Sequence, residues 1–583
     1  MKREVCGMKF FHVYNERYFD GLVKNNLINE DSGFKIQHVF SLAEDMKFNR
    51  FAAKGTRLHG MIKEGKHPFY VDRLTGGVTY HKYDFDHALI REYEDILGKW
   101  FLGFQLHESA SNRLNSDWVR IINKMDGSKG PYDPETLRAR LISTYAVTPD
   151  GTYLPSLSQG SPEEYAALTY AETPEAYMDE VRWLFARRMQ ETNGYILPCD
   201  SYYMLTHMQD ELGMRTFMPE VGCQIPQMRR AVALARGIAG YRDKLWGTYY
   251  ETWISWPEEG LSMPCFNSEP GNEWYLTQET HPDDFTSKGK NGGSSRLLQR
   301  RIYYYSLMSG ADYMAEEWGL NCSYSDMKTF ELSEYGLAKK DFIDTARTLR
   351  GVKAVIPFAI VLPKEYECME LLGAYQEETL GVDRRRYMQY ALQGDQARRI
   401  GHIEDVLKLI FSRPEKGYGN ENHVMTNSRF GDLFDIIYED APEHVLKKYD
   451  ALIDASMDGA FAREKGADFR VLESGNLDRL TEEINRLAAE SLPCTVDSLH
   501  WLISEDEQGR RFLSIFNNEG NERSVRLGDV LRSEADARVK VTFKEAAQLR
   551  MVKASCGAVR IEKADEETYY VDVPAAGFAI LQF

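Results

Sequence analysis

Five glutamates stand at or near the carboxyl ends of short segments that have the composition of β-strands. The segments are WFLGFQLHE, which ends at Glu108, RTFMPEVG with Glu220, LWGTYYETW with Glu251, and ADYMAEEWG with Glu316 and Glu317. The carboxyl ends of the strands of a parallel barrel meet at one mouth, so these carboxyl groups are expected to gather there. Two carboxyl groups can cleave a glycosidic bond, because one protonates the leaving oxygen while the other attacks carbon or activates water. A separation of about 5–5.5 Å gives retention of configuration, and about 6.5–9.5 Å gives inversion.

Strand-like and helix-like segments alternate over the first 320 or so residues. The strand candidates are 9–15, 34–41, 68–74, 100–108, 195–203, 215–222, 245–253 and 311–319, and apolar residues recur at helical spacing in 86–99, 176–190 and 225–244. This alternation predicts a parallel sheet, and eight strands predict a (β/α)8 TIM barrel. In that count Glu108 ends the fourth strand and Glu251 the seventh. Glu220 and Glu317 are the rival nucleophiles, and Glu220 leads if the count slips by one.

The rest of the chain changes pattern twice, which predicts an α/β protein of three domains. The barrel is expected over 1–350, with a long insertion at 112–175 and a loop at 254–295 that ends in the flexible sequence SKGKNGGSS. A Rossmann-like α/β domain is expected over 351–490, because its first segment, AVIPFAIVLP, is a continuous buried-strand run. Alternating apolar and polar residues predict a C-terminal antiparallel β-sandwich over 491–583.

Composition and charge exclude several classes of partner. The net charge of −18 argues against nucleic acid and anionic membrane surfaces, since both are bound by clustered Lys and Arg. There is no run of 18 apolar residues and no signal-peptide core, and the eight cysteines are scattered without C-x-x-C spacing. We therefore expect reduced thiols, no cofactor or metal, and a cytoplasmic protein. Aromatic residues make up 12%, which suits a protein that stacks rings on sugars.

The segment YEDILGKWFLGFQLHES resembles the fourth-strand region of family 42 β-galactosidases in glycoside hydrolase clan A. The matching residues are Gly103, Phe104, Gln105 and Glu108, and a YGLAKKDF segment, a Rossmann-like domain opening on PFAIVLP and a small β-domain follow in the same order. Members of this clan retain configuration. The resemblance therefore implies Glu108 as acid/base and Glu251 as nucleophile. In that family the middle domain supports trimer formation, so a homo-oligomer, a trimer among the possibilities, is expected.

The sequence departs from the clan at the residue before Glu108. The clan has Asn there, which holds the sugar 2-hydroxyl, whereas this chain has His107. A histidine can donate the same hydrogen bond, but the change leaves the substrate open. Families of β-mannosidases have a similar layout, so a β-mannoside or another β-glycoside is the alternative to a β-galactoside. The cysteine cluster that some family 42 members use for zinc is absent.

Several further residues are candidates for binding substrate. Trp318 resembles the aromatic floor beneath the sugar, and Arg73, at the end of the third strand, could hold the nucleophile ionised. The remaining candidates are His107, Glu220 and Glu317 for sugar hydroxyls, and Tyr203, Tyr250 and Trp253 for the walls of the site.

Other classes of function fit the sequence less well. No G-x-G-x-x-G follows the first strand of the middle domain, so no phosphate-binding loop is visible, and the 13 histidines do not follow the pattern of a metal-dependent barrel hydrolase. The expected function is therefore a retaining, exo-acting β-glycosidase that is β-galactosidase-like and acts on an oligosaccharide or β-glycoside. A non-catalytic carbohydrate-binding barrel is the alternative from another class, and it would not need the paired acids.

Overall fold

The structure is a computed structural model of the 583-residue chain. It describes residues 7–14, 19–36, 52–71, 87–107, 174–200, 203–223, 227–256, 260–262, 264, 285–287, 290–317, 319–364, 366–367, 395–412, 421–524, 528–555 and 559–583.

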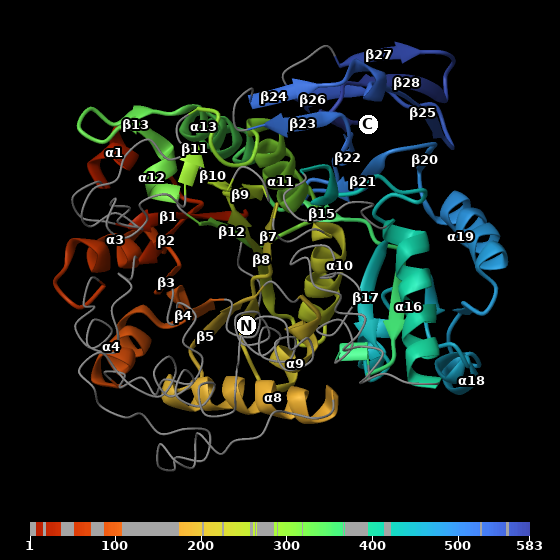
Figure 1. Ribbon diagram of the computed structural model, residues 1–583, viewed down its shortest axis with the longest axis horizontal. Coiled ribbons are helices and arrows are strands. Elements are labelled where there is room, and N and C mark those ends of the chain that lie inside the picture. The colour runs from red at the N-terminus through yellow and green to blue at the C-terminus, as the bar shows by residue number, and fades with distance from the viewer. Residues whose placement is uncertain are drawn as a thin grey trace, which may run out of the picture.

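A parallel sheet curls into a nearly closed barrel (Figure 1). Its strands are β1 (Lys9–Tyr14), β2 (Ser32–Ile36), β3 (Phe69–Val71), β4 (Phe101–His107), β5 (Ile196–Cys199), β6 (Thr216–Phe217), β7 (Glu220–Gly222), β8 (Leu245–Glu251) and β12 (Tyr313–Glu316). The order is β5-β4-β3-β2-β1-β12-β8-β6, and β7 also pairs with β8. The eight predicted strands are confirmed, with the sixth divided into β6 and β7 at Pro219, which has no N–H to donate. The Glu220 N–H donates to the Asp200 carbonyl after β5 and so links the two edges, at 3.2 Å.

Side chains alternate between the inside and the outside of this barrel. The inner cluster contains Phe11, Tyr70, Leu102, Leu197, Cys199, Met218, Tyr249, Tyr313 and Ala315. These large side chains fill the barrel, as expected for a packed (β/α)8 core. The alternation fixes the direction of every second residue at the strand ends, where the predicted acids lie.

Helices cover the barrel on its outer side. They are α1 (Phe19–Lys24), α3 (Arg57–Gly65), α4 (His87–Leu97), α8 (Pro174–Glu191), α9 (Thr206–Glu211), α10 (Met228–Ala239), α11 (Arg296–Met308), α12 (Gly319–Ser323) and α13 (Glu334–Ala346). The helices predicted over 86–99, 176–190 and 225–244 are confirmed as α4, α8 and α10. Ser295 caps α11, because its hydroxyl accepts from the Leu298 N–H. Among the described residues, no helix is both long and apolar enough to cross a membrane.

A second parallel sheet lies beside the barrel, within 351–490. Its strands are β16 (Phe358–Leu362), β17 (Phe434–Tyr438), β18 (Ala451–Asp454) and β19 (Val471–Glu473), in the order β17-β16-β18-β19, and its helices are α16 (Asp395–Phe411), α17 (Glu443–Leu446), α18 (Ala460–Lys465) and α19 (Leu477–Ser491). Barrel helix α10 packs directly on β17 (Figure 1). A Cβ on Gly237 would lie 2.3 Å from the Ile436 carbonyl oxygen, so only glycine permits this approach. Ion pairs from Arg229 to Asp432 and from Arg236 to Asp435 reinforce the contact.

The C-terminal part consists of antiparallel strands. They are β20 (Cys494–Val496), β21 (His500–Glu505), β22 (Arg511–Phe516), β23 (Asn521–Ser524), β24 (Gly528–Leu531), β25 (Ala537–Phe543), β26 (Arg550–Ala554), β27 (Arg560–Lys563), β28 (Thr568–Val573) and β29 (Phe578–Gln582). With β15 (Lys353–Ala354) they form the sheets β15-β21-β22-β29-β26 and β20-β25-β28-β27 and the hairpin β23-β24. The two larger sheets meet through Phe543 and Phe583, whose rings lie 5.1 Å apart.

The prediction of one continuous strand over 354–363 is wrong. The segment 354–363 does not form one continuous strand, because β15 (Lys353–Ala354) pairs with β21 and the parallel sheet begins only at Phe358. Pro357 stands between the two and cannot donate to a ladder. The remaining strands are β9 (Ile254–Trp256), β10 (Gly260–Ser262), β11 (Phe285–Ser287), β13 (Tyr324–Asp326) and β14 (Glu331–Leu332).

Gly103, one of the motif residues in β4, is required by the backbone. Its φ is +119°, and the pairing of β3 with β4 shifts register next to it. A Cβ at this position would lie 2.6 Å from the Tyr195 carbonyl oxygen. The residue therefore combines a backbone conformation that L-residues avoid with a close approach of two chain segments.

We expect Gly103→Ala to lower the free energy of unfolding by roughly 3 kcal/mol, because strain and a backbone clash add. Gly98→Ala is the matched control, since Gly98 has φ +51° but no atom within 4 Å of the added Cβ. The control should cost only about 1 kcal/mol. Calorimetric unfolding of both variants measures the difference. Equal shifts would show that the approach to Tyr195 is unimportant.

Candidate functional site

Four predicted site residues lie at the carboxyl ends of the barrel strands. His107 ends β4, Glu220 begins β7, Glu251 ends β8 and Glu317 directly follows β12. All four are at most 4% exposed. Glu220 pairs with Tyr249 across the sheet, and Tyr249 belongs to the inner cluster, so alternation turns Glu220 and Glu251 toward the barrel interior. The mouth therefore holds buried carboxyl groups, as the sequence predicted.

Three of the predicted residues, Glu317, His107 and Trp253, form one group around the Glu317 carboxylate. The indole N–H of Trp253 donates to Glu317 Oε2 at 2.8 Å. On the other side, His107 Nε2 lies 3.9 Å from Glu317 Oε1. The His107 ring packs edge-on against Tyr249, with ring centres 5.4 Å apart. The group reaches from the fourth strand to the eighth and so crosses the mouth of the barrel.

The Glu251 carboxylate is accommodated by a glycine on the neighbouring strand. Gly222 pairs with Glu251 in the register of β7 and β8. A Cβ on Gly222 would lie 2.7 Å from Glu251 Cβ and 2.8 Å from Glu251 Oε2. Any larger residue at position 222 would push the carboxylate away from its present place.

Lys35 lies beneath the acids and was not predicted as a site residue. Its side chain is fully buried, and its ammonium group donates to the Glu316 carbonyl at 2.8 Å and to the Tyr249 hydroxyl at 3.4 Å. A buried cation lowers the free energy needed to keep nearby carboxyl groups ionised. One signal was available in the sequence, since a lysine interrupts the apolar strand at 34–41.

Glu316 and Glu317 are adjacent but face opposite sides of the barrel. The Glu316 carboxylate accepts hydrogen bonds from Tyr303 on α11 and Tyr335 on α13, and it pairs with Lys339 at 2.5 Å. Burial, and then the charge of Glu316, raise the pKa of both tyrosines well above its usual value. The Glu316 carboxylate therefore binds the barrel strand to helices α11 and α13, while the Glu317 carboxylate faces the mouth.

Tyr250 is the predicted site residue that points away from the mouth. Its hydroxyl bonds to Ser294, and its ring meets Tyr303 of α11 edge-on at 6.0 Å. Direct binding of sugar by Tyr250 stays a prediction. Tyr203 begins the short helix η3 (Tyr203–Leu205), and its side chain is not among those described. Glu108, Arg73 and Trp318 also lie outside the described residues.

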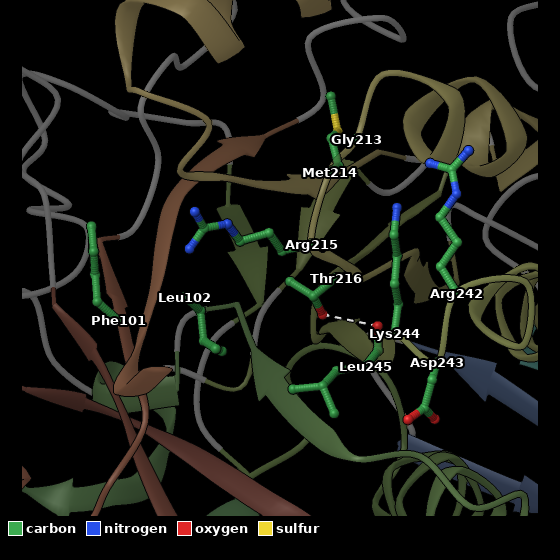
Figure 2. A pocket seen from close by; sticks show the side chains of 10 residues that line it. All are labelled: Phe101, Leu102, Gly213, Met214, Arg215, Thr216, Arg242, Asp243, Lys244 and Leu245. Carbon is green, nitrogen blue, oxygen red and sulfur yellow. Dashed lines mark hydrogen bonds between the residues drawn. The ribbon is translucent and has the colours of Figure 1, made fainter. Parts of the chain in front are cut away.

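A cavity of about 340 Å³ opens at the opposite end of the barrel (Figure 2). It is lined by Phe101, Leu102, Gly213, Met214, Arg215, Thr216, Arg242, Asp243, Lys244 and Leu245, which lie at or before the amino ends of β4, β6 and β8. Two of its cations are already paired, since Lys244 and Arg242 lie 2.6 and 3.7 Å from Asp210. Sites on (β/α)8 barrels form at the carboxyl ends of the strands, so this cavity is not the candidate active site.

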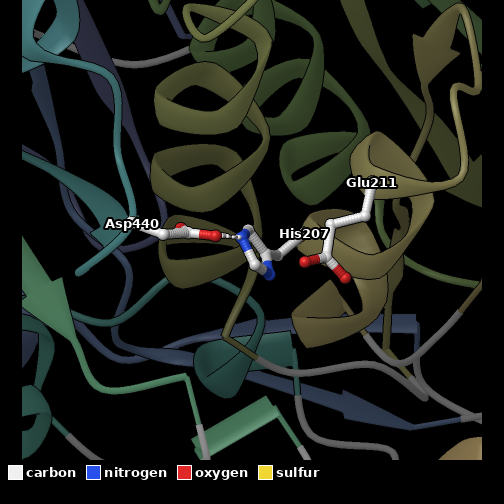
Figure 3. A group of neighbouring side chains, drawn as sticks. All are labelled: His207, Glu211 and Asp440. Carbon is white, nitrogen blue, oxygen red and sulfur yellow. Dashed lines mark hydrogen bonds and ion pairs between the residues drawn. The ribbon is translucent and has the colours of Figure 1, made fainter.

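His207, Glu211 and Asp440 are spaced closely enough to hold a metal ion (Figure 3). Burial disfavours a charge on His207, but hydrogen bonds and charges from Asp440 and Glu367 outweigh it and raise the pKa of His207 to about 9. A protonated imidazole has no lone pair for a metal. Glu211 is also occupied, by Arg182 at 2.7 Å and by Lys364. The group is an ion-pair network between helix α9 and the end of β17.

Comparisons with known proteins give structural likenesses only. No protein-family model matches the sequence, and no curated protein matches it. The structure is similar to an α-L-fucosidase isoenzyme 2 from Paenibacillus thiaminolyticus, with TM-score 0.41, 10% identity and 99% of each chain covered. It is also similar to a GH5_18 protein from Streptomyces cattleya, with TM-score 0.32, 10% identity and 81% of this chain and 99% of that chain covered. A rhamnosidase from Novosphingobium sp. PP1Y gives TM-score 0.32, 10% identity and coverage of 86% and 48%. Likenesses at these values carry no conclusion about activity.

The His207 network should make the barrel's contact with the second sheet sensitive to alkali. The folded-state pKa of about 9 lies above the ordinary value of 6.5, so the stabilisation is complete below pH 6.5 and is lost as the pH rises through 9. We expect the midpoint of thermal unfolding to fall between pH 8 and 10 in the wild type. The fall should be smaller in His207→Gln, which should already be less stable at pH 7. His402→Gln, on α16, is the control, because burial lowers the pKa of His402 and the residue does not titrate at alkaline pH. An equal alkaline fall in His207→Gln would refute the assignment.

Proposed function

We propose that this protein is a retaining, exo-acting β-glycosidase, with Glu251 as nucleophile and Glu108 as acid/base. The observation that carries the proposal is the position of Glu251. It is a buried residue at the carboxyl end of the seventh strand of an eight-stranded barrel. The strand count on which the pairing with Glu108 depends agrees with the sheet order. Glu108 directly follows His107 in the sequence, and its role as acid/base is part of the proposal.

The proposed reaction is a double displacement. Glu251 attacks the anomeric carbon while Glu108 protonates the departing oxygen, and Glu108 then removes a proton from the water that hydrolyses the glycosyl-enzyme. The absence of a side chain at Gly222 permits the present place of the Glu251 carboxylate, because a Cβ there would lie 2.8 Å from Glu251 Oε2. Lys35 is buried and donates to the Glu316 carbonyl and the Tyr249 hydroxyl near these strand ends.

His107 and Glu317 are proposed to bind one sugar hydroxyl between them. Their 3.9 Å separation is too long for a direct hydrogen bond. An oxygen placed about 2.8 Å from each atom could accept from His107 and donate to Glu317. Trp253 holds the carboxylate in place for that contact through its 2.8 Å hydrogen bond. This arrangement would take over the role that asparagine has in the clan.

The proposed substrate is a β-galactoside, with a β-mannoside or another β-glycoside as the alternative. The choice depends on the resemblance at Gly103, Phe104, Gln105 and Glu108 and on the substitution at His107. We further propose a homo-oligomer and a cytoplasmic location. The buried free thiols of Cys199, Cys223, Cys322 and Cys494 support a reducing compartment.

Replacing the two proposed catalytic carboxylates tests the function directly. We expect Glu251→Gln and Glu108→Gln to lower kcat by on the order of 10³-fold or more on a panel of para-nitrophenyl β-glycosides, with sugar binding retained. Azide should restore turnover in Glu251→Gly with inverted configuration, and in Glu108→Ala with retained configuration.

The matched control for these variants is Glu331→Gln, which changes an exposed glutamate on β14 and should keep wild-type activity. Binding of sugar by a wild type without turnover would favour the carbohydrate-binding alternative. Full activity of Glu251→Gln would refute the nucleophile assignment.

The space beside Glu251 gives an independent prediction. Gly222→Ala should lower kcat by about 100-fold, because a 1 Å displacement of a reacting group costs that much. Gly60→Ala is the control, since no atom lies within 4 Å of the added Cβ. Steady-state kinetics on the best aryl glycoside measures both. A wild-type kcat for Gly222→Ala would mean that the carboxylate does not act from this position.

A further inference from the structure

The loop at 290–295 forms hydrogen bonds with Tyr250 and Thr252, the residues before and after Glu251 in the sequence. Ser294 is fully buried, and its hydroxyl bonds to the Tyr250 hydroxyl. The Ser294 N–H donates to the Thr252 carbonyl at 3.0 Å, and its hydroxyl lies 3.3 Å from the same oxygen. One serine therefore fixes the residue before the proposed nucleophile and the residue after it.

The glycine before this serine lets the loop press against strand β8. Gly293 has φ +64°, and a Cβ there would lie 2.5 Å from the Thr252 carbonyl oxygen. The Gly293 N–H donates to the Ser262 hydroxyl at 3.0 Å. The loop is thus packed on the end of the strand, although its composition predicted flexibility.

The loop is itself held by the C-terminal hairpin β23-β24. Arg523 on β23 has a side chain that is only 5% exposed, and it donates to the carbonyls of Gly293 at 3.0 Å and Asn291 at 2.5 Å. It also lies 3.4 Å from the Gly292 carbonyl. Its charge is balanced by Asp529 at 2.6 Å and by Glu421 at 3.9 Å. An arginine fork directed at three successive carbonyls fixes the path of a backbone.

Glu421, in the short helix η5 (Glu421–His423), secures the other end of the loop. Its buried carboxylate accepts hydrogen bonds from the Ser295 N–H and hydroxyl and from the Asn521 side-chain amide. Burial, and then the charges of Glu421 and Glu251, raise the pKa of the Cys223 thiol well above its usual value. The charges of both carboxylates therefore act on the same thiol. Glu421 and the proposed nucleophile Glu251 thus both lie close enough to Cys223 to affect it electrostatically.

We propose that the hairpin β23-β24, acting through Arg523 and the loop at 290–295, positions Glu251 for attack. Arg523 is then a positioning residue contributed by the C-terminal β-structure to an active site on the barrel. The inference rests on the proposed function. Its physical reason is that a displacement of about 1 Å in a reacting group costs about 100-fold in rate, and Ser294 fixes both neighbours of Glu251.

The test compares Arg523→Gln and Arg523→Lys with Arg538→Gln, in the full-length protein. Arg538 is a matched control, because it forms ion pairs with Glu562 and Asp572 on the exposed face of the same β-structure. The probe is a 2,4-dinitrophenyl 2-deoxy-2-fluoro-β-glycoside of the sugar that the aryl glycoside panel identifies. The rate at which it labels Glu251 is followed by intact mass, alongside kcat, KM and the unfolding midpoint.

We expect Arg523→Gln to lower kcat and the labelling rate together by roughly 10–100-fold, with KM changed less than about threefold. Arg523→Lys should recover part of the loss, because its charge remains but its fork does not. Arg538→Gln should match the wild type. Tyr250→Phe, which removes only the hydroxyl bound to Ser294, should also slow labelling and decides the matter if Arg523→Gln does not fold.

Two outcomes separate failure of the inference from failure of the proposed function. Labelling of the wild type at Glu251, with unchanged labelling in Arg523→Gln and Tyr250→Phe, would overturn the positioning role and leave the function intact. A lower unfolding midpoint with unchanged kcat per folded molecule would do the same, because it would show a purely structural contact. Absence of any labelling in the wild type would overturn the proposed function itself.

Discussion

A buried carboxylate needs hydrogen-bond donors to replace the water it has lost. The donors to Glu421 come from both the barrel and the C-terminal β-structure, so this one carboxylate links them. It accepts from Ser295 at the start of α11 and from Asn521 at the start of β23, and Arg523 lies 3.9 Å away. Removing one donor would leave part of a buried charge uncompensated, which costs several kcal/mol in proteins. The barrel, the segment that follows α16 and the C-terminal hairpin are therefore held at one point, beside the strand that carries Glu251.

The acids of the barrel are supported by a similar principle on two sides. Outside, Glu316 is neutralised by Lys339 and hydrogen-bonded by two tyrosines, which ties the eighth strand to α11 and α13. Inside, Lys35 donates to the Glu316 carbonyl beneath the mouth. A dense group of carboxyl groups would otherwise repel itself and lose its charge. Lys339 therefore compensates the Glu316 carboxylate outside the barrel, while Lys35 provides a buried donor inside it.

Local pattern predicted the elements, while contacts between distant residues decided their details. Segments with strand or helix periodicity lie where expected, because periodicity reflects which face is buried. The position of Glu251 followed from counting strands, and the outward direction of Tyr250 was available from the same alternation, since it is one residue away. The firm packing of 290–295 could not be predicted from its Gly and Ser composition. It depends on Arg523, which lies more than 200 residues later in the sequence. The partners of Lys35 were hidden for the same reason.

The end of β8 is thus restrained from three directions by parts of the sequence that are far apart. Gly222 leaves space beside the Glu251 carboxylate, Lys35 reaches Tyr249 from below, and Ser294 holds Tyr250 and Thr252 from outside. None of these groups has to touch a substrate to affect the reaction, since each acts on where one carboxylate stands. A nucleophile that is held in this way loses little freedom on reaching the transition state, and supporting contacts of this kind are what fix catalytic geometry. On the proposed function, the C-terminal β-structure would contribute to the active site through its contacts with the loop at 290–295, which packs on the end of strand seven.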